Sequence, residues 1–585
     1  MGTISDKLMR IINTKEDIRQ ALISKGYDVP TSIPFKEYAK MISDLPCNAD
    51  SFPDIEGIVA RYSALGLTNE QMAANPVWVD KTGNGHDIQL KNFSWKGMSG
   101  VGGYEMNFNL WRNNVPSIPD ISMSTTTTSV SVSVGNSTYN NNLIYIHISN
   151  WDINKNHLLK VTSTYEDGDL AFVFYNDSNT EKIGLPANGY VNILAYPEFK
   201  GSYMYISTIS NKQGSFTIEQ FPLYPGALVF DGVDDYGVCE NFPILTKEKG
   251  YTVVALRQYL FNATDKIRSL VTNAPSSIVS RSTLTFELIG SNGAKTNFSF
   301  GRGNPVSDFE PNGFSYMTSK SYNGKTITPG DVTESNKRML VGNFSENGKY
   351  GSNVAIWELV FLDHDATEEE LTKIKDYFVK TYPWLFPDQA WTVVGKTNED
   401  EDRATIANIT GNGNNLILSN FGFAEGSGYN EQGEYAGYLV TDGVDDKVQS
   451  SSFTLNEDWT IVGDWELLSN VQINCGIVKA QNVYLYNTAN GLLISINNPR
   501  SLQSFGTKSL HAICSDGRLY DRNWVEYEYT VDQNFEIVKS SLNIGFNLNN
   551  YTQIAFKNLG IYNNQILSKD DCIKAYNYLQ TLKSK

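Results

Sequence analysis

The 585-residue chain has few cysteines, the residues whose disulfides stabilise small secreted proteins. Its cysteines are few and scattered, and no two form a CxxC pair: Cys47, Cys239, Cys475, Cys514 and Cys572. A disulfide framework needs an even set of cysteines at characteristic spacings. We therefore interpret these thiols as small buried hydrophobic side chains. Free thiols of this kind predict synthesis in a reducing cytoplasm, wherever the protein later acts.

Targeting signals and long apolar runs are also missing. The opening MGTISDKLMRII has no apolar stretch of the kind that a signal peptide carries, and Asp6 stands where myristoylation requires Ser or Thr. No run approaches the roughly 20 apolar residues that span a bilayer. The sequence predicts a protein made without a secretion signal and not inserted into a membrane.

Positive charge is scarce. The chain has 47 Lys and Arg against 64 Asp and Glu, for a net charge of −17. A surface of this sign repels a phosphate backbone, so we expect no nucleic-acid partner.

Catalytic motifs are absent as well. The five histidines show no metal-binding spacing, and TGNGH at Thr82 lacks the helix and lysine with which a glycine-rich loop binds phosphate. It is interpreted as a turn. Glycosidases need two facing carboxylates, whereas the apolar run VAIWELVF offers only Glu358. We predict that the protein is not an enzyme.

What the sequence does have is aromatic residues and short strand-like runs. It contains 33 Tyr, 28 Phe and 10 Trp, and runs such as YTVVALRQYL and WTIVGDWELL alternate with clusters of Gly, Asn, Asp and Pro. This pattern is typical of antiparallel sandwiches rather than βαβ units. The predicted fold class is mainly β, with several antiparallel β-sandwiches after a short helical N-terminal segment.

Three phrases occur twice in the same order. TGNG begins at 82 and 410, DGVDD at 231 and 442, and a capped helix follows Thr367 and again Ser568, each with an acidic residue three positions on. The first pair is 328 residues apart and the second only 211, so the first copy holds about 117 extra residues between the two phrases. Duplication followed by insertion explains this arrangement.

Four parts follow from this arrangement. Residues 1–46 form a helical segment, and residues 51–104 with 226–387 form a first, split sandwich. The insert, 105–225, is a further β-sandwich that resembles a carbohydrate-binding module, and 388–585 form the second copy. Because the insert interrupts its host between two strands, we expect its ends to lie close together.

The repeated DGVDD is interpreted in two ways. Gly232 and Gly443 suit a tight hairpin turn between two strands, with the aspartates bonding to nearby N–H groups. Clustered carboxylates are also the ligands that calcium prefers. The alternative is therefore a calcium site, whose candidate ligands are Asp231, Asp234, Asp235, Asp442, Asp445 and Asp446.

The phrase ALVFDGVDDYGV resembles the FDGxxDYV signature of laminin-G-like, concanavalin A-like jelly rolls. The second copy, YLVTDGVDDKV, departs from the signature at Thr441 and Lys447. The phrase LTNEQMAANPVWVDKTGNGHDIQL, from Leu67, is similar to the opening of such domains in virion proteins of tailed, crAss-like phages that infect Bacteroidales. The resemblance implies two concanavalin A-like jelly rolls, one with an inserted sandwich, in a virion protein.

From these observations we expect a non-catalytic virion structural protein, part of a fibre, decoration or baseplate, made in the host cytoplasm. Residues 1–46 either anchor it to other virion proteins or pack on its own first sandwich. Its sandwiches would bind host-surface glycans or neighbouring virion proteins. A fibre role would suit a homotrimer, but the sequence has no long heptad repeats and so encodes no coiled-coil shaft. The alternatives are a bacterial surface lectin or adhesin and, less favoured, a glycan-cleaving enzyme.

Overall fold

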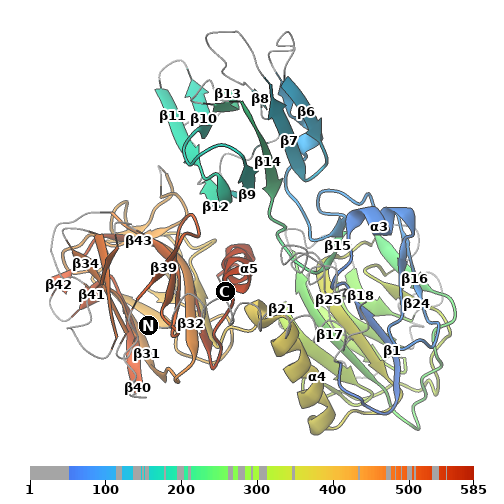
Figure 1. Cartoon of the computed structure of the whole chain (residues 1–585). Coiled ribbons are helices and arrows are strands. Elements are labelled where there is room, and N and C mark those ends of the chain that lie inside the picture. The colour runs from blue at the N-terminus through green and yellow to red at the C-terminus, as the bar shows by residue number, and fades with distance from the viewer. Residues whose placement is uncertain are drawn as a thin grey trace, which may run out of the picture. The chain divides into compact units, whose positions relative to one another are not determined.

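The computed structural model describes most of the chain after residue 51 (Figure 1). The described residues are 52–113, 121–135, 146–147, 151, 157–176, 179–193, 203–208, 213–260, 268–273, 284–290, 294–301, 312–344, 350–432, 435–468, 476–480, 483–488, 491–496, 503–505, 509–529, 539–547 and 550–584. The N-terminal helices expected in residues 1–46 therefore lie outside the described residues. By its contacts the chain divides into two units, Met1–Asp54 and Ile55–Lys585.

The fold is mainly β and built from antiparallel sheets, as predicted. The first copy contains an eight-stranded and a seven-stranded sheet. In sheet order the larger consists of β23 (Lys325–Thr326), β22 (Ser321–Tyr322), β21 (Asn312–Thr318), β17 (Thr252–Tyr259), β25 (Asn353–Leu362), β15 (Leu228–Asp231) and β4 (Gly100–Val101), with β1 (Ile58–Ser63) also paired to β25. The smaller consists of β2 (Val77–Trp78), β3 (Ile88–Lys91), β16 (Tyr236–Cys239), β24 (Met339–Val341), β18 (Arg268–Thr272), β19 (Leu284–Ile289) and β20 (Lys295–Ser299).

The two sheets of the first copy face each other across one hydrophobic core. Tyr62 of the larger sheet contacts Trp78 of the smaller one, with ring centroids 5.6 Å apart. Phe361 contacts Phe242 at 4.9 Å. Burying one face of each sheet against the other is what stabilises a sandwich.

Helix α4 (Glu368–Thr381) lies beside the larger sheet (Figure 1). The predicted capping box is confirmed, because the side chains of Thr367 and Glu370 each bond to the other's backbone N–H. The helix buries Leu371, Ile374, Tyr377 and Phe378, and Phe378 contacts Phe314 of β21 at 6.0 Å. The sheet thus has a core face and a face covered in part by α4. The short helices α3 (Asn69–Ala74), η1 (Phe108–Leu110) and η4 (Pro383–Leu385) occur elsewhere in the chain.

The second copy repeats this topology. Its first eight-stranded sheet consists of β29 (Gly428–Tyr429), β30 (Leu439–Val440), β43 (Ile554–Asn563), β32 (Trp459–Leu467), β37 (Leu510–Cys514), β38 (Arg518–Asp521) and β39 (Glu526–Glu528), with β26 (Gln389–Thr392) paired to β43. Its second consists of β27 (Thr405–Ile406), β28 (Leu416–Ser419), β31 (Lys447–Thr454), β40 (Lys539–Ile544), β33 (Gly476–Ala480), β34 (Val483–Thr488), β35 (Gly491–Ile496) and β36 (Gln503–Phe505). A two-stranded sheet pairs β41 (Phe546–Asn547) with β42 (Asn550–Tyr551).

The equivalence of the copies extends to a shared irregularity. In the first copy the register between β17 and β25 shifts at Leu256/Arg257, opposite Glu358. In the second, the register between β32 and β43 shifts at Asp464/Trp465, opposite Asn558. Because bulges are specific features of a strand pair, a bulge at the same place supports duplication.

Helix α5 (Lys569–Thr581) closes the second copy. The Ser568 side chain caps the helix by accepting a hydrogen bond from the Asp571 N–H at 3.1 Å. The capping box predicted for Ser568 and Asp571 is wrong, because the Asp571 side chain does not bond to the Ser568 backbone N–H. Aspartate is one methylene shorter than glutamate, and here its carboxylate accepts from the Ser568 hydroxyl at 2.7 Å instead. No helix among the described residues is both long and apolar enough to cross a membrane.

The intervening strands form two further five-stranded sheets. One consists of β11 (Asn179–Leu185), β10 (Leu170–Asn176), β13 (Tyr203–Thr208), β8 (Ile146–His147) and β5 (Arg112–Asn113). The other consists of β12 (Asn188–Ile193), β9 (His157–Ser163), β14 (Gly214–Gln220), β7 (Ser129–Val134) and β6 (Ile121–Thr125). Both contribute to one core that includes Phe172 and Ile218.

The segment that holds these strands leaves and rejoins its host at neighbouring positions. Val101 of β4 pairs with Leu228 of β15, and Gly100 pairs with Val229. The two ends are therefore adjacent rungs of one sheet. The exact four-part division of the chain stays a prediction.

Candidate functional site

The first DGVDD phrase is a turn that carries the chain from one sheet of the sandwich to the other. It joins β15 to β16, which belong to different sheets, so the hairpin expected from the sequence is wrong. The Asp231 N–H donates to Asp235 Oδ2 at 3.0 Å, and the Val233 N–H donates to Asp231 Oδ1 at 2.7 Å. Gly232 has φ +78°, a conformation that favours glycine. These hydrogen bonds are those of a turn, but β16, the strand that follows it, belongs to the opposite sheet of the sandwich.

The second phrase makes the same bonds between β30 and β31. The Asp442 N–H donates to Asp446 Oδ2 at 2.8 Å, and the Val444 N–H donates to Asp442 Oδ1 at 2.8 Å. Gly443 has φ +74°. Identical residues therefore form an identical crossover in each copy.

A second loop, which no sequence motif indicates, holds each turn. Ser99 donates its hydroxyl to Asp235 Oδ1 at 3.0 Å, and Asn92 donates its amide to the Asp234 carbonyl at 3.0 Å. The equivalent donors are Ser427 to Asp446 at 3.1 Å and Asn420 to the Asp445 carbonyl at 2.9 Å. Both pairs of donors are 328 positions apart, the same offset as TGNG, which is the signal that would have identified them. We call each turn with its serine and asparagine a crossover lock.

The structure brings together the candidate metal ligands of each copy. One carboxylate oxygen from each of Asp231, Asp234 and Asp235 lies within 4.8 Å of the others, and the same holds for Asp442, Asp445 and Asp446. Burial, together with the neighbouring Asp231, raises the pKa of Asp235 to about 7. Burial raises the pKa of Asp446 to about 6. Carboxylates grouped in this way repel one another unless a proton or a cation intervenes.

The bonding favours the turn over the metal. Both oxygens of Asp235 already accept hydrogen bonds, from Asp231 and Ser99, and Asp231 Oδ1 accepts one from Val233. Calcium takes six to eight oxygen ligands. Three carboxylates, with several oxygens already used, provide only part of such a shell. The hydrogen bonds account for the carboxylates of Asp231 and Asp235, and of Asp442 and Asp446, as structural elements of the crossover locks.

The buried carboxylates of the first copy are also engaged. Glu358 Oε2 accepts from Arg61 Nε at 3.2 Å, and Glu358 Oε1 accepts from the Tyr382 hydroxyl at 2.8 Å. Glu287 is paired with Arg257 and accepts from the Tyr322 hydroxyl at 2.9 Å. The side chains of Glu358 and Glu287 are 0% exposed. Neither of these two side chains reaches the solvent.

Two of the histidines with described side chains, His364 and His511, are held by contacts within the fold. His364 contacts Glu370 at 3.2 Å beside the start of α4. His511 is buried and stacks on Tyr576 with ring centroids 4.4 Å apart. Burial lowers the pKa of His511 to about 4, so its ring is neutral near pH 7. His147 lies in β8.

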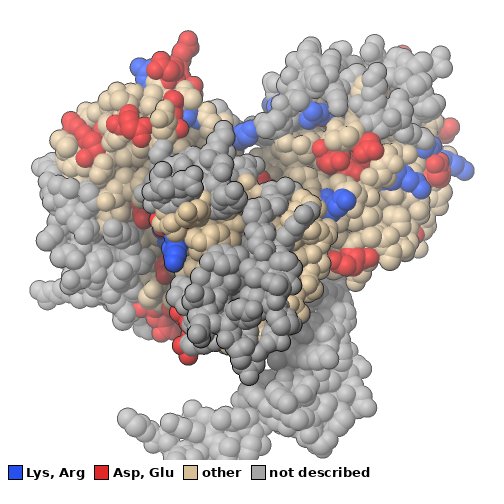
Figure 2. Space-filling model, turned by 90° about the horizontal axis from the view of Figure 1, so that it is seen from above, with Lys and Arg blue, Asp and Glu red and all other residues tan. Residues whose placement is uncertain are grey.

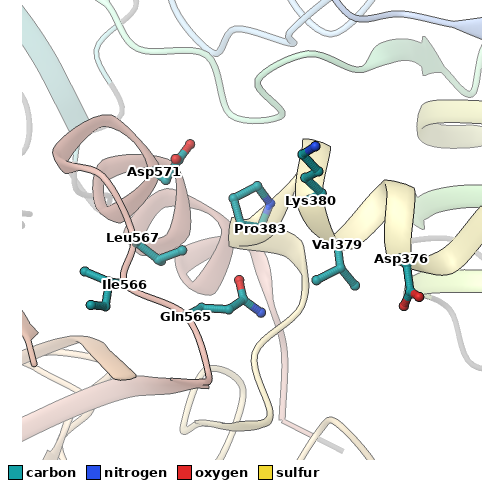
Figure 3. A pocket seen from close by; sticks show the side chains of 8 residues that line it. All are labelled: Asp376, Val379, Lys380, Pro383, Gln565, Ile566, Leu567 and Asp571. Carbon is teal, nitrogen blue, oxygen red and sulfur yellow. The ribbon is translucent and has the colours of Figure 1, made fainter. Parts of the chain in front are cut away.

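Two neighbouring cavities lie where α4 and η4 meet the second copy. One, of about 310 Å³, is lined by α4 and η4 on one side and by residues 565–567 and the start of α5 on the other (Figure 3). The other, of about 520 Å³, extends along the linker after η4 to the TGNG turn of the second copy. Both cavities are lined by Val379 and Gln565. We call them together the junction groove.

The second TGNG phrase forms one wall of this groove. Thr410 donates its hydroxyl to the Asp388 carbonyl at 3.1 Å, and Asn412 donates its amide to the same carbonyl at 2.8 Å. Asp388 Oδ2 accepts from the Asn563 N–H at 2.6 Å, and burial raises the pKa of Asp388. The phrase is a turn, as predicted, and its polar side chains line a cavity, which the sequence did not indicate.

Acidic and basic side chains are interspersed on the face shown in Figure 2. On the face shown in Figure 2, Asp and Glu lie in several separate groups, with Lys and Arg side chains between them. The large negative net charge therefore does not form a single patch on this face.

Comparisons with known proteins assign no function. No protein-family model matches the chain, and no curated protein matches it. Similar solved structures include a Trypanosoma rangeli sialidase in complex with sialic acid, at 9% identity and a TM-score of 0.24 over 79% of this chain and 84% of that one. The binding domain of botulinum neurotoxin serotype D aligns at 10% identity and a TM-score of 0.24, over 58% of this chain and 88% of that one.

A third alignment is shorter. The Trypanosoma rangeli sialidase in complex with the inhibitor DANA aligns at 8% identity and a TM-score of 0.20, over 44% of this chain and 62% of that one. Similarity this low carries no argument about function. The comparisons place the chain in no family.

Proposed function

We propose that the protein is a non-catalytic structural subunit of a phage virion, in a fibre, a decoration or the baseplate. In this role it is made in the host cytoplasm and joins the particle through residues 1–46. Its sandwiches bind host-surface glycans or neighbouring virion proteins. The phage context rests on the resemblance of the phrase at Leu67 to the opening of virion jelly-roll domains, whereas the phrase at Ala227 resembles the jelly-roll signature alone.

The observation that supports a non-catalytic role most strongly is the state of the buried carboxylates. A glycosidase needs two carboxyl groups that both reach the substrate, about 5–5.5 Å apart in retaining enzymes and about 6.5–9.5 Å apart in inverting ones. Glu358 and Glu287 are instead closed off from solvent, each in an ion pair with an arginine. The acidic turns use their oxygens to bond the backbone.

The repeated architecture supports a display role. Each crossover lock ties together the two sheets of its own sandwich with the same set of hydrogen bonds. The tip of each turn also presents a valine, with Val233 61% and Val444 70% exposed. A rigid sandwich with exposed loop tips is suited to presenting a binding surface.

Mass spectrometry of purified, nuclease-treated virions tests the structural role. We expect peptides from the whole chain at a fixed copy number per particle. Their absence from virions, with the protein found on the bacterial surface instead, would favour a bacterial adhesin and refute the proposal. Release of free sugars from host glycans by the purified protein would refute the non-catalytic part.

A further inference from the structure

We propose that the junction groove binds an uncharged saccharide. The inference rests on the proposed function, since it assigns one site and one ligand class to glycan binding. Its volumes of about 310 and 520 Å³ fall within the range typical of small-molecule pockets. Three features of its lining favour a saccharide: aromatic rings, oriented amides and a balance of charge.

Aromatic rings supply an apolar surface. Phe314 of β21, Phe386 of the linker and Tyr578 of α5 all line the larger cavity. Phe314 and Phe386 are only partly buried, so part of each ring is accessible from the groove. One face of a pyranose ring carries C–H groups, and burying them against aromatic rings is favourable.

Two amides face the larger cavity with opposite hydrogen-bonding roles. The Asn412 amide nitrogen donates to the Asp388 carbonyl, which leaves the side-chain carbonyl of Asn412 as an acceptor. Asn323 Oδ1, the side-chain oxygen, accepts from the Tyr316 N–H at 2.9 Å, which leaves the side-chain NH₂ group of Asn323 as a donor. Each sugar hydroxyl is both donor and acceptor, so a wall that offers one fixed donor and one fixed acceptor suits it.

The smaller cavity adds a further amide. In Figure 3 the side chain of Gln565 lies between the loop before α5 and Val379 of α4. Gln565 lines both cavities, so a ligand that extends from one to the other passes this amide. A saccharide of two or more units fits such an arrangement better than a single small ion.

The charges of the lining cancel. Three lysines and three aspartates line the two cavities: Lys375, Lys380, Lys583, Asp376, Asp388 and Asp571. A site for phosphate or another anion needs an excess of positive charge or a cluster of N–H donors. An equal number of both signs, on a chain with a net charge of −17, favours a ligand without charge.

The connection between the copies holds the groove in shape. Tyr382 donates its hydroxyl to Glu358 in the first copy, at 2.8 Å. Two residues later the Trp384 carbonyl accepts from the Tyr562 hydroxyl of the second copy at 2.9 Å, and Lys574 lies 4.2 Å from the centre of the Trp384 ring. A pre-formed site loses less entropy on binding than one that must order itself.

The test uses the full chain on an array of neutral oligosaccharides, followed by calorimetry with the best binder. The variants are Asn412→Ala, Phe314→Ala and Gln565→Ala. The matched control is Asn84→Ala, because Asn84 occupies the same position in the first TGNG turn and donates to the Val59 carbonyl at 3.0 Å, outside the groove. Thermal unfolding of each variant checks that its fold is retained.

We expect each groove variant to weaken binding about tenfold, the loss of roughly one good contact, while Asn84→Ala binds like the wild type. If the wild type binds a saccharide and all three groove variants bind it equally well, the groove is not the site, and glycan binding at another surface survives. If the wild type binds no neutral saccharide, the inference fails, while detection of the protein in virions still decides its structural role. Competition by inorganic phosphate would also overturn the assignment.

Discussion

Removal of the Glu287 carboxylate should destabilise the first sandwich strongly. Glu287 and Arg257 are both 0% exposed. Arg257 Nε donates to Glu287 Oε2 at 2.8 Å, and the hydroxyls of Tyr322 and Tyr259 donate to the same carboxylate at 2.9 and 3.2 Å. In Glu287→Ala a buried guanidinium loses its counterion, and two buried hydroxyls lose an acceptor. Breaking a buried pair from one side costs about 3–5 kcal/mol.

The backbone does not complicate this comparison. Glu287 has φ +56°, which is strained for any residue with a Cβ, and alanine keeps the same strain. The matched control is Glu240→Ala. Glu240 Oε2 lies 2.9 Å from Arg338 Nε, and the Glu240 side chain is 66% exposed, so this variant breaks an ion pair at the surface. Exposed pairs contribute about 0–1 kcal/mol, so the control should remain close to the wild type.

Hydrogen exchange measured by mass spectrometry suits a chain of several sandwiches, because it reports on each strand separately. The expected loss corresponds to exchange faster by roughly two to three and a half orders of magnitude in peptides from β17 and β19. Peptides from the second copy should not change. The reasoning fails if Glu287→Ala increases exchange no more than Glu240→Ala does. In a double variant, Arg257→Met with Glu287→Leu, much of the loss should be recovered, since no uncompensated charge remains.

Two further predictions concern protons and metal ions. Burial lowers the pKa of His511 from 6.5 to about 4, so its contribution to stability is complete above pH 6.5 and is lost as the pH falls toward 4. Between pH 6.5 and 4 the free energy of unfolding should fall by about 3 kcal/mol because of His511. His511→Phe keeps a ring against Tyr576 and should remove this dependence on pH. Equal acid sensitivity of the wild type and the variant in urea unfolding would contradict this. For the crossover locks we expect calcium and EDTA to leave thermal unfolding unchanged. A rise in Tm with calcium that Asp235→Asn and Asp446→Asn together abolish would instead establish a metal site.

Much of the fold was accessible from the sequence because local patterns determine it. Alternating apolar runs gave the strands, and repeated phrases gave the duplication, which the matching sheet orders support. The Thr367 cap is predictable for the same reason, since a capping box involves residues only three positions apart. These signals are short in range and depend little on the rest of the chain.

Features that depend on distant partners cannot be predicted from local sequence patterns. The DGVDD phrase looks like a hairpin turn locally, and only the pairing of β15 with β25 and of β16 with β24 shows that it changes sheets. The pairing of Arg61 with Glu358 joins residues 297 positions apart. The junction groove combines Phe314, Asn412 and Gln565 from three separate segments, and no spacing in the sequence connects them.

The rung formed by Val101 and Leu228 has a consequence for the history of this protein. A module that departs from and returns to adjacent strand ends places almost no geometric demand on its host. Guests of other sizes and sequences can then be exchanged at this position while every other strand keeps its partner. In a virion protein of the kind proposed, such an exchange would change the inserted surface without altering the scaffold.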